Sequence, residues 1–346
     1  MRIPVKTLRT FMVEAATVLP LDRKYAESMV DNLITANLWG INSHGVGRYP
    51  VYMGRLRKNL VNRTPNIKIE STFPAVMTVD GDNGLGAVVT TAALEAAMKV
   101  ADTCGIALAG IKNSNHFGAA GYYSNIAAEK GNVCIICTVG PPNMPPFGGA
   151  EPYFSTNPLS VGMPNIKRPH IILDMATSMA AKGKIREAAR KGEPIPEGWA
   201  IDKDGNPTTD AQAAVDGLVL PMAGHKGSGL ALVIEHLAGV STGSGFGTDV
   251  VMQYGDDPTP ANVGHSLIVY KPEALLTREI YEQRMERFCS ELHAIRPAKG
   301  FHHVMLPGEK EFENEQVIME KGIEVDEALR NQLTEIEQLT GCKLLA

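Results

Sequence analysis

Hydrophobic positions in the first forty residues recur at the spacing of an α-helix. Leu8, Phe11, Met12 and Ala15 fall on one helical face, and a second helical run extends over about 22–39 and stops at Gly40. Glycine readily adopts the left-handed conformation that often ends a helix. The chain is therefore predicted to begin with two amphipathic helices, followed by a polar turn and another short helix.

From about residue 71 the pattern changes to short apolar runs that alternate with helical ones, which is typical of an α/β domain. Strands are predicted at about 75–80, 106–111, 133–139, 159–163, 171–173 and 266–270, and helices at about 87–102, 118–129, 180–190 and 227–239. After residue 272 the chain becomes helical and charged, with helices at 278–295 and 326–339.

The two ends of the chain are both amphipathic and neither is long enough to stand alone, so we expect the tail to pack on the N-terminal helices. Residues 1–70 and 272–346 are predicted to form a helical lobe for substrate binding and dimerisation. Residues 71–271 are predicted to form the α/β domain that binds a cofactor.

Composition places the chain among folded proteins and narrows its partners. It has 346 residues, of which 44% are hydrophobic and 21% charged, values close to the globular average. The 33 basic and 38 acidic residues give a net charge of -5, which argues against nucleic acid as a partner. A signal peptide and a membrane-spanning run are not recognisable, and five scattered cysteines do not suggest a disulfide framework. We expect a cytoplasmic protein.

The glycine-rich fingerprint of a Rossmann dinucleotide site is not matched. In the run 84–89 the third glycine is replaced by Val89, and in the run 243–248 the last glycine comes one position early. A P-loop is also excluded, because Lys226 is followed by Gly227 rather than by serine or threonine. Two glycine-dense turns, 147–149 and 224–229, could still bring backbone amides close to phosphate groups; ordinary loop glycines are the alternative.

The polar turn Ser43-His44-Gly45 is the first candidate for chemistry. Imidazole titrates near neutral pH, and the guanidinium of Arg48, four residues on, could bind a carboxylate through two hydrogen bonds. The turn therefore fits a proton shuttle beside a carboxylate clamp. The same residues would also fit a surface turn whose histidine bonds only to the backbone.

Two strand-to-helix junctions are the other candidates. One is the run 113–118 with His116, and the other is the run 174–178 with Asp174, where Thr177 or Ser178 could instead cap the next helix. Cys134 and Cys137 face opposite sides of a strand and have no second pair, so no metal site is predicted.

Taken together, these runs resemble the malate/L-lactate dehydrogenase family, which is distinct from the Rossmann lactate and malate dehydrogenases. The matching runs are Ser43-His44-Gly45-Val46-x-Arg48-x-Pro50, Asn115-His116-Phe117-Gly118-x-x-Gly121-Tyr122-Tyr123, Pro145-Pro146-Phe147-Gly148-Gly149, Thr156-Asn157-Pro158, Asp174-Met175-Ala176-Thr177-Ser178, Gly183-Lys184-Ile185, Ile195-Pro196-Glu197-Gly198, Asp202-x-x-Gly205-x-Pro207-Thr208-Thr209-Asp210, Lys226-Gly227-x-Gly229-Leu230 and Pro307-Gly308-Glu309.

The resemblance implies a non-Rossmann α/β fold with a central mixed sheet, an intertwined homodimer, and NAD or NADP as cofactor. It implies an NAD(P)-dependent 2-hydroxyacid dehydrogenase of the malate, sulfolactate or lactate type. The family's catalytic positions match His44, the proton donor to the substrate oxygen during reduction, and His116, which acts as the base in some relatives. The substrate-binding positions match Ser43, Arg48 and Tyr52. The cofactor contacts match Asp174, Met175, Ala176, His225, Lys226, Pro307, Gly308 and Glu309.

The chain departs from the family pattern in two places, and the first bears on the substrate. Relatives commonly carry a polar run where this chain has 138–143, and often Gly-Gly-Pro where it has Ala223-Gly224-His225. A ureidoglycolate dehydrogenase or a cyclic imino-acid reductase on the same fold is therefore an alternative. A metabolite-binding protein without activity, and a metal-dependent hydrolase built on His44 and His116, are others.

Overall fold

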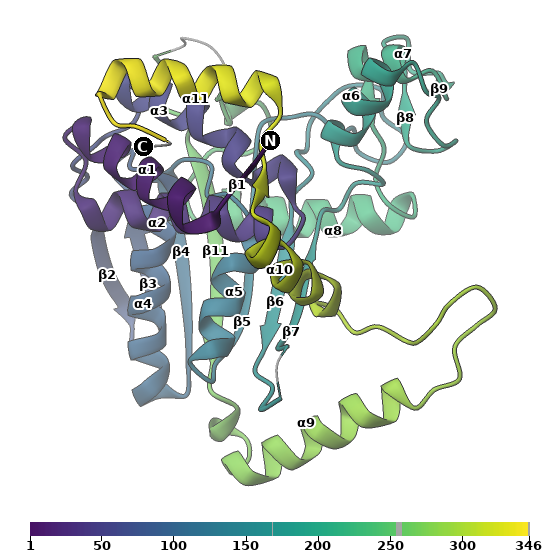
Figure 1. Cartoon of the computed structure of the whole chain (residues 1–346). Helices are drawn as coiled ribbons and strands as arrows, with labels where there is room; N and C mark the ends of the chain where they lie inside the picture. The colour runs from purple at the N-terminus through teal and green to yellow at the C-terminus, as the bar shows by residue number, and fades with distance from the viewer. Residues whose placement is uncertain (168, 254–257, 345–346) are drawn as a thin grey trace.

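A mixed β-sheet forms the centre of the computed structural model, which describes residues 1–167, 169–253 and 258–344 (Figure 1). Within these residues the sheet has seven strands in the order β2-β3-β4-β11-β5-β6-β7. Their bounds are β2 Lys68–Phe73, β3 Val76–Asp80, β4 Ile106–Ser114, β11 Val263–Tyr270, β5 Val133–Thr138, β6 Leu159–Met163 and β7 Ile171–Met175. Strands β3 and β4 are parallel, whereas the other neighbouring pairs are antiparallel. The sheet is therefore not the parallel sheet of a Rossmann domain.

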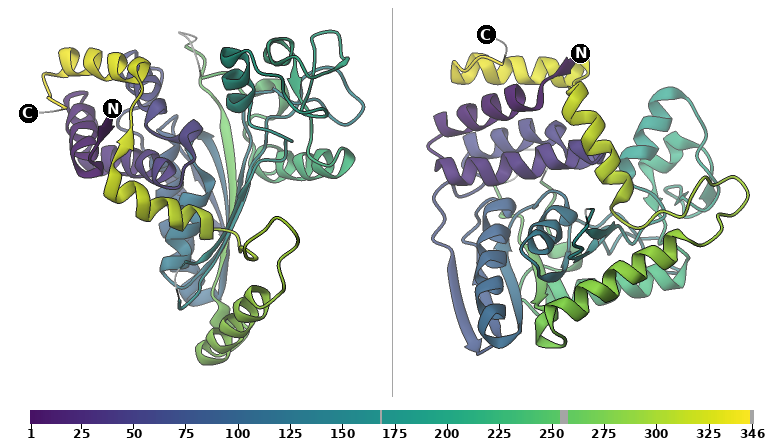
Figure 2. Two further views of the ribbon diagram at one scale, coloured as in Figure 1. Left: turned by 45° about the vertical axis from the view of Figure 1, so that its right-hand side comes forward. Right: turned by 60° about the horizontal axis from the view of Figure 1, so that its bottom comes forward.

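Helices cover both faces of this sheet (Figure 2). Helices α4 (Gly86–Cys104) and α5 (Ala120–Glu129) pack on one face. Their alanines and the inward residues of the strands, among them Ile111, Ile136 and Leu267, form one apolar core. The other face is covered by α8 (His225–Glu235) and its π-helical continuation His236–Val240. Burial on both faces explains why the central strands are almost continuously apolar.

The two ends of the chain meet in a helical lobe. Helices α1 (Val5–Val18), α2 (Arg23–Leu38) and α3 (Tyr49–Arg57) share one core with α11 (Glu327–Thr340), and α10 (Glu309–Lys321) lies on α2. The first strand, β1 (Arg2–Ile3), pairs with β12 (Ile323–Glu324). Most of the tail thus packs on the N-terminal helices, as the amphipathic patterns predict.

Helix α9 (Arg278–His293) departs from that expectation, because it stands away from the N-terminal helices (Figure 1). It contacts the β6–β7 connection, where the Tyr281 hydroxyl donates a hydrogen bond to the carbonyl of Pro164 over 3.1 Å. Of its residues, all of which the structure describes, Cys289 is the buried one. A helix with so little apolar surface against the body gains little from burial.

A small lobe follows β7 and was not distinguished from the rest of the α/β domain by its sequence. Helices α6 (Lys182–Lys191) and α7 (Ala211–Asp216) pack on a sheet of β8 (Ala200–Ile201), β9 (Pro207–Thr208) and β10 (Leu218–Val219). Helix α6 begins after Ala181, so the alternative interpretation, in which Thr177 or Ser178 caps it, is wrong. The Thr177 hydroxyl instead donates to the carbonyl of Thr156 over 2.9 Å.

A close approach between sheet and helix leads to a stability prediction. A Cβ atom on Gly162 of β6 would lie 2.2 Å from the backbone oxygen of Ser124 in α5. We expect Gly162→Ala to lower the free energy of unfolding by about 1–3 kcal/mol, because strand and helix must move apart. Gly54→Ala is the matched control, since a Cβ atom there would meet nothing within 4 Å, and it should be neutral or slightly stabilising. Urea denaturation measures both, and equal midpoints would contradict the prediction.

Candidate active site

The turn that carries His44 is held by a buried amide of helix α2. The side-chain oxygen of Asn37 accepts a hydrogen bond of 2.6 Å from the Val46 N–H, and its nitrogen donates to the side chain of Asn42 over 2.8 Å. A Cβ atom on Gly45 would lie 2.1 Å from the Asn37 oxygen. The turn therefore needs glycine at this position, and the amide fixes where His44 stands.

A second amide of α2 holds the loop that carries His116, between β4 and α5. The side-chain oxygen of Asn32 accepts a hydrogen bond of 3.1 Å from the Ala119 N–H. Gly118 has a φ of +81°, and a Cβ atom there would lie 1.8 Å from the same oxygen. Asn32 and Asn37 are 1% and 6% exposed. One helix thus positions both histidine loops.

The two histidines stack against each other. The ring centroids of His44 and His116 are 5.4 Å apart with an interplanar angle of 18°. Nδ1 of His116 accepts a hydrogen bond of 3.2 Å from the Gly118 N–H, and the Tyr52 hydroxyl lies 2.5 Å from the same nitrogen. Because a backbone N–H can only donate, Nδ1 is unprotonated and the proton of the neutral ring is on Nε2.

Burial and a neighbouring cation keep both rings uncharged. Desolvation, followed by the charge of Arg48, lowers the pKa of His44 to about 4. The same two causes, with His44 a weaker one, lower the pKa of His116 well below its ordinary value. Arg48 is itself oriented by a 2.8 Å hydrogen bond from its Nε to the carbonyl of Ser43. The structure therefore brings the two neutral imidazoles, His44 and His116, together with the Arg48 guanidinium and the side chains of Ser43 and Tyr52.

Strand β7 brings two of the proposed cofactor segments together. Asp174 lies near its end, and the N–H of Ile172 donates a hydrogen bond of 3.0 Å to the carbonyl of Pro307. Gly308 has a φ of +97°, and a Cβ atom there would lie 2.9 Å from the carbonyl of His170. The 307–309 turn can lie this close to the strand only because it contains glycine.

The third cofactor segment is linked to the same strand. The N–H of Met222 donates a hydrogen bond of 2.9 Å to the carbonyl of Thr177, just after β7. Three residues later His225 begins helix α8, preceded by Gly224 with a φ of +61°. His225 and Lys226 are exposed there. The N–H groups of residues 226–228 already donate to backbone carbonyls, so a phosphate here would be attracted by the Lys226 side chain and the positive end of the helix.

The two glycine turns singled out in the sequence meet at this helix start. The Phe147 N–H donates a hydrogen bond of 2.9 Å to the hydroxyl of Ser228, and the Phe147 ring lies 5.9 Å from the ring of His225. A Cβ atom on Gly224 would lie 3.2 Å from the Phe147 ring. The turns 147–149 and 224–229 thus form one surface.

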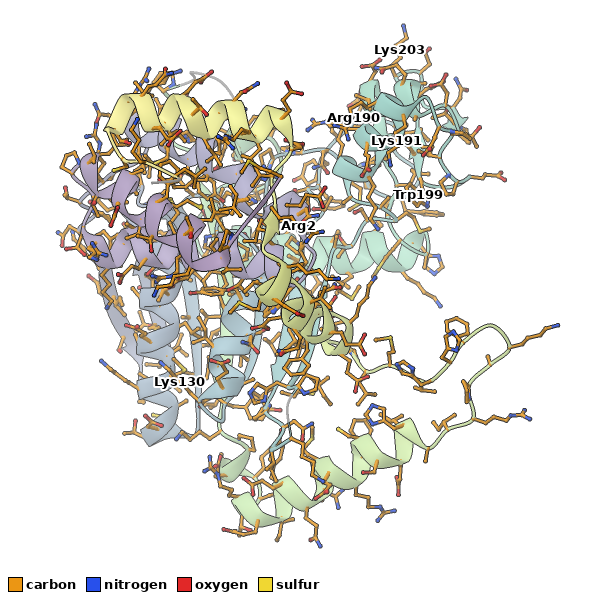
Figure 3. All side chains as sticks on the ribbon, viewed as in Figure 1. Arg2, Lys130, Arg190, Lys191, Trp199 and Lys203 are labelled. Atoms are coloured by element: carbon orange, nitrogen blue, oxygen red, sulfur yellow. The ribbon has the colours of Figure 1, made fainter. Side chains whose placement is uncertain are left out.

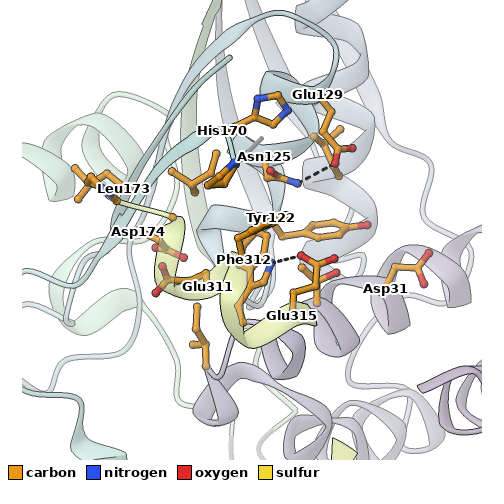
Figure 4. A pocket seen from close by; sticks show the side chains of 18 residues that line it. Asp31, Tyr122, Asn125, Glu129, His170, Leu173, Asp174, Glu311, Phe312 and Glu315 are labelled. Carbon is orange, nitrogen blue, oxygen red and sulfur yellow. Dashed lines mark hydrogen bonds between the residues drawn. The ribbon is translucent and has the colours of Figure 1, made fainter. Parts of the chain in front are cut away.

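A cavity of about 470 Å³ opens between α2, α5, β7 and α10 (Figure 4). Asp174, Pro307 and Gly308 contribute to its wall. The described residues that line it include no lysine or arginine but five carboxylates, those of Asp31, Glu129, Asp174, Glu311 and Glu315. The Asp174 carboxylate accepts a hydrogen bond of 2.8 Å from the Gly121 N–H, and burial raises its pKa to about 6. This hydrogen bond links the cavity wall to α5, the helix that follows the His116 loop.

Glu309, the last residue of the predicted cofactor set, is already engaged by the protein. Its carboxylate lies 2.6 Å from Nε2 of His293 in α9 and accepts a 2.7 Å hydrogen bond from the Leu306 N–H.

Asn32 and Asn37 are the residues that position the site and that the sequence analysis missed. A signal was present in the sequence, because a side-chain amide on the apolar face of a predicted amphipathic helix needs a buried hydrogen-bond partner.

The described part of the chain has no cluster of three or more His, Cys, Asp or Glu residues suited to holding a metal ion. It also has no helix that is both long and apolar enough to cross a membrane.

A family model described as malate/L-lactate dehydrogenase matches residues 3–334. The chain belongs to this family. The resemblance drawn from the motifs is confirmed, as are the predicted α/β class with its central mixed sheet and the assignment as a dehydrogenase. Family membership implies a nicotinamide cofactor.

Relatives within the family are similar over nearly the whole chain. The L-sulfolactate dehydrogenase of Methanocaldococcus jannaschii is 40% identical over 90% of this chain and 89% of its own length. The malate/(S)-sulfolactate dehydrogenase of Methanothermus fervidus is 35% identical over 95% of both. The solved structure of sulfolactate dehydrogenase from Methanocaldococcus jannaschii superimposes with a TM-score of 0.94 at 37% identity, covering 99% of this chain and 98% of that chain.

The run 138–143, in which this chain departs from the family pattern, begins next to the loop that carries His116. The hydroxyls of Thr138 and Ser114 lie 2.7 and 2.9 Å from the two ring nitrogens of His265. The His265 ring stacks on Phe117 with centroids 4.6 Å apart. Thr138 thus supports the loop of His116 through a buried ring.

The depressed pKa of His44 can be measured directly. Histidine-labelled protein, with His44 assigned by its loss in His44→Gln, should show this ring titrating near pH 4 by NMR. Arg48→Ala should raise the pKa of His44, because a nearby positive charge disfavours imidazolium, yet leave it below the ordinary value because burial persists. An ordinary pKa in the unsubstituted protein, or no shift in Arg48→Ala, would contradict this electrostatic assignment.

Proposed function

We propose that this protein is an NAD(P)-dependent dehydrogenase that interconverts a small 2-hydroxy acid and its 2-oxo acid, of the malate, sulfolactate or lactate type. The observation that carries the proposal is the stacked pair His44 and His116 beside Arg48. The His116 loop leads into α5, whose Gly121 N–H donates to Asp174 in the cavity wall. A base, a carboxylate clamp and a cofactor cradle are the parts that this reaction needs.

The residues present fit a dinucleotide. Pro307 and Gly308 line the cavity beside β7, and the exposed Lys226 at the start of α8 supplies a positive charge for a phosphate. Asp174, Met175, Ala176 and Pro307 would line the path between these places, and His225 would flank it. When bound, the nicotinamide ring supplies or accepts the hydride; the protein provides position and proton transfer.

We assign the proton to His44. Arg48 binds the substrate carboxylate in a bidentate manner and so fixes the reacting carbon, with Ser43 and Tyr52 beside it. In the oxidation direction, neutral His44 removes the hydroxyl proton. A bound carboxylate offsets the charge of Arg48, which raises the pKa of His44 and allows its protonated form to donate during reduction.

His116 has a different part in this proposal. Its Nδ1 accepts hydrogen bonds from Gly118 and Tyr52, so its Nε2–H is the group left to face the reacting oxygen or His44. A fixed donor of this kind stabilises the negative charge that develops on the oxygen. Tyr52 would act by holding the ring in that tautomer.

We also propose that the protein is a cytoplasmic homodimer. Exposed apolar side chains along α8 and its continuation, Leu232, Val233 and Leu237, give a face that a second copy could cover. The five cysteines are all free thiols, which suits a reducing compartment.

Kinetic analysis of three variants tests the proton and carboxylate assignments. His44→Ala should lower kcat for oxo-acid reduction by about 10²–10⁴-fold with a small change in KM, because general acid–base catalysis is lost. Arg48→Ala should mainly raise KM, by about tenfold or more, because a charge-assisted bidentate contact is lost.

His302→Ala is the control, since His302 is exposed and outside the site. The substrate panel comprises oxaloacetate, pyruvate, sulfopyruvate and a cyclic imino acid, tested in reduction, and ureidoglycolate, tested in oxidation. Near-normal turnover of His44→Ala would remove His44 from the mechanism, and cofactor binding without turnover of any panel member would favour a metabolite-binding protein.

The acidic cavity further leads us to propose a preference for NAD over NADP. Asp174 and Glu311 lie in the cavity wall with Gly308, and the charge of Glu311 contributes to the raised pKa of Asp174. A 2′-phosphate bound there would add a further negative charge to this wall and be repelled.

We expect kcat/KM for NADH to exceed that for NADPH by about tenfold or more, the effect of a like charge at close range. Glu311→Lys should raise kcat/KM for NADPH and so bring the NADH-to-NADPH ratio of kcat/KM closer to one. Glu313→Lys, on the same helix but outside the cavity lining, should leave the ratio unchanged. An enzyme that prefers NADPH would refute this assignment.

A further inference from the structure

Helix α6 of the small lobe stands against the catalytic turn. A Cβ atom on Gly183, in the first turn of this helix, would lie 3.8 Å from Cβ of Ser43. Residues three apart on a helix share a face, so Arg186 lies one turn further along the side that faces Ser43. The small lobe therefore contributes a side of the substrate site.

The side that α6 presents carries positive charge. The charge of Arg186 acts on Arg48 and on Lys182, in both cases lowering the pKa of the neighbouring cation. Lys182 is held by a 3.3 Å hydrogen bond from its Nζ to the carbonyl of Gly217. Arg186 is exposed, so its guanidinium can reorient toward a ligand. Two guanidinium groups that repel each other across a small site would both be stabilised by a ligand with an anionic group at each end.

We propose that Arg186 binds a second anionic group of the substrate, so that the enzyme is selective for small 2-oxo and 2-hydroxy acids with a carboxylate or sulfonate at the far end. Arg48 binds the carboxylate next to the reacting carbon, and Arg186 binds the anionic group at the other end of the substrate. This inference rests on the proposed dehydrogenase function and adds the substrate class and a specificity-determining residue to it.

The test compares oxaloacetate and sulfopyruvate with pyruvate, which lacks the second anion, by following the loss of NADH absorbance. The unsubstituted enzyme should have a kcat/KM for a doubly charged acid at least about 10-fold above that for pyruvate, the effect of one charge-assisted contact. In Arg186→Ala, kcat/KM for the doubly charged acids should fall by about the same factor, largely through a higher KM. The kcat/KM for pyruvate should stay within about twofold of the unsubstituted value. Arg186→Lys should recover part of it.

Lys191→Ala is the matched control. Lys191 lies on the same helix and is labelled in Figure 3, and its Nζ pairs with Glu187 over 2.8 Å at the surface. The Lys191→Ala substitution also removes one positive charge from α6. It should leave kcat/KM for oxaloacetate, sulfopyruvate and pyruvate unchanged.

The outcomes separate this inference from the proposed function. A preference for either doubly charged acid that Arg186→Ala abolishes supports the inference. Equal losses with pyruvate and the doubly charged acids in Arg186→Ala, or an enzyme that uses pyruvate equally well, overturn the inference and leave the dehydrogenase proposal standing. Turnover of none of the three acids, nor of the imino acid and ureidoglycolate, overturns both.

Discussion

The site depends on two side-chain amides of one buried helix. Asn32 and Asn37 of α2 accept hydrogen bonds from the backbone of the His116 loop and of the His44 turn. An amide buried without partners would cost on the order of 1–3 kcal/mol, so each loop and its amide stabilise the other. Gly45 and Gly118 allow the close approach that these bonds require. The distance between the two histidine rings is thus determined by a helix that contributes no catalytic group.

This arrangement places the proposed chemistry where three parts of the chain meet. The His44 turn belongs to the helical lobe, the His116 loop to the central sheet, and α6 to the small lobe. The helical lobe is closed by the last helices of the chain, since β1 pairs with β12 and α10 lies on α2. Burial at this junction keeps the histidines neutral, while Arg48 and Arg186 keep the site attractive to anions.

Much of the fold could be predicted because its signals are local. The apolar runs at 106–111, 133–139 and 159–163 correspond to β4, β5 and β6, and the alanine-rich run from 87 corresponds to α4. Strand β2 was missed because all its residues are exposed, which leaves no alternation to detect. Helix α10 was missed too; it has no buried residue and therefore a weak apolar face. The two-residue strands of the small lobe exist only through their pairing partners.

The sequence identified candidate site residues, but it did not show how the fold brings them together. His44 and Arg48 are close in sequence, so their partnership can be read from spacing; His116 is linked to them through Tyr52 and α2, which only the fold brings together. The influence of Arg186 on Arg48 spans more than a hundred residues and has no signal in local pattern.

The missing Rossmann fingerprint has a physical explanation in the same geometry. In a Rossmann domain one glycine loop between a strand and a helix brings the backbone to the pyrophosphate. Here the close approaches are distributed: Gly308 beside β7, Gly224 before α8, and Phe147 bonded to Ser228. Three short segments, each with its own glycine or helix start, can form a cradle around the end of one antiparallel strand. A sequence search for a single motif finds nothing, because in the proposed cofactor site the close backbone approaches are divided among segments that lie far apart in the sequence.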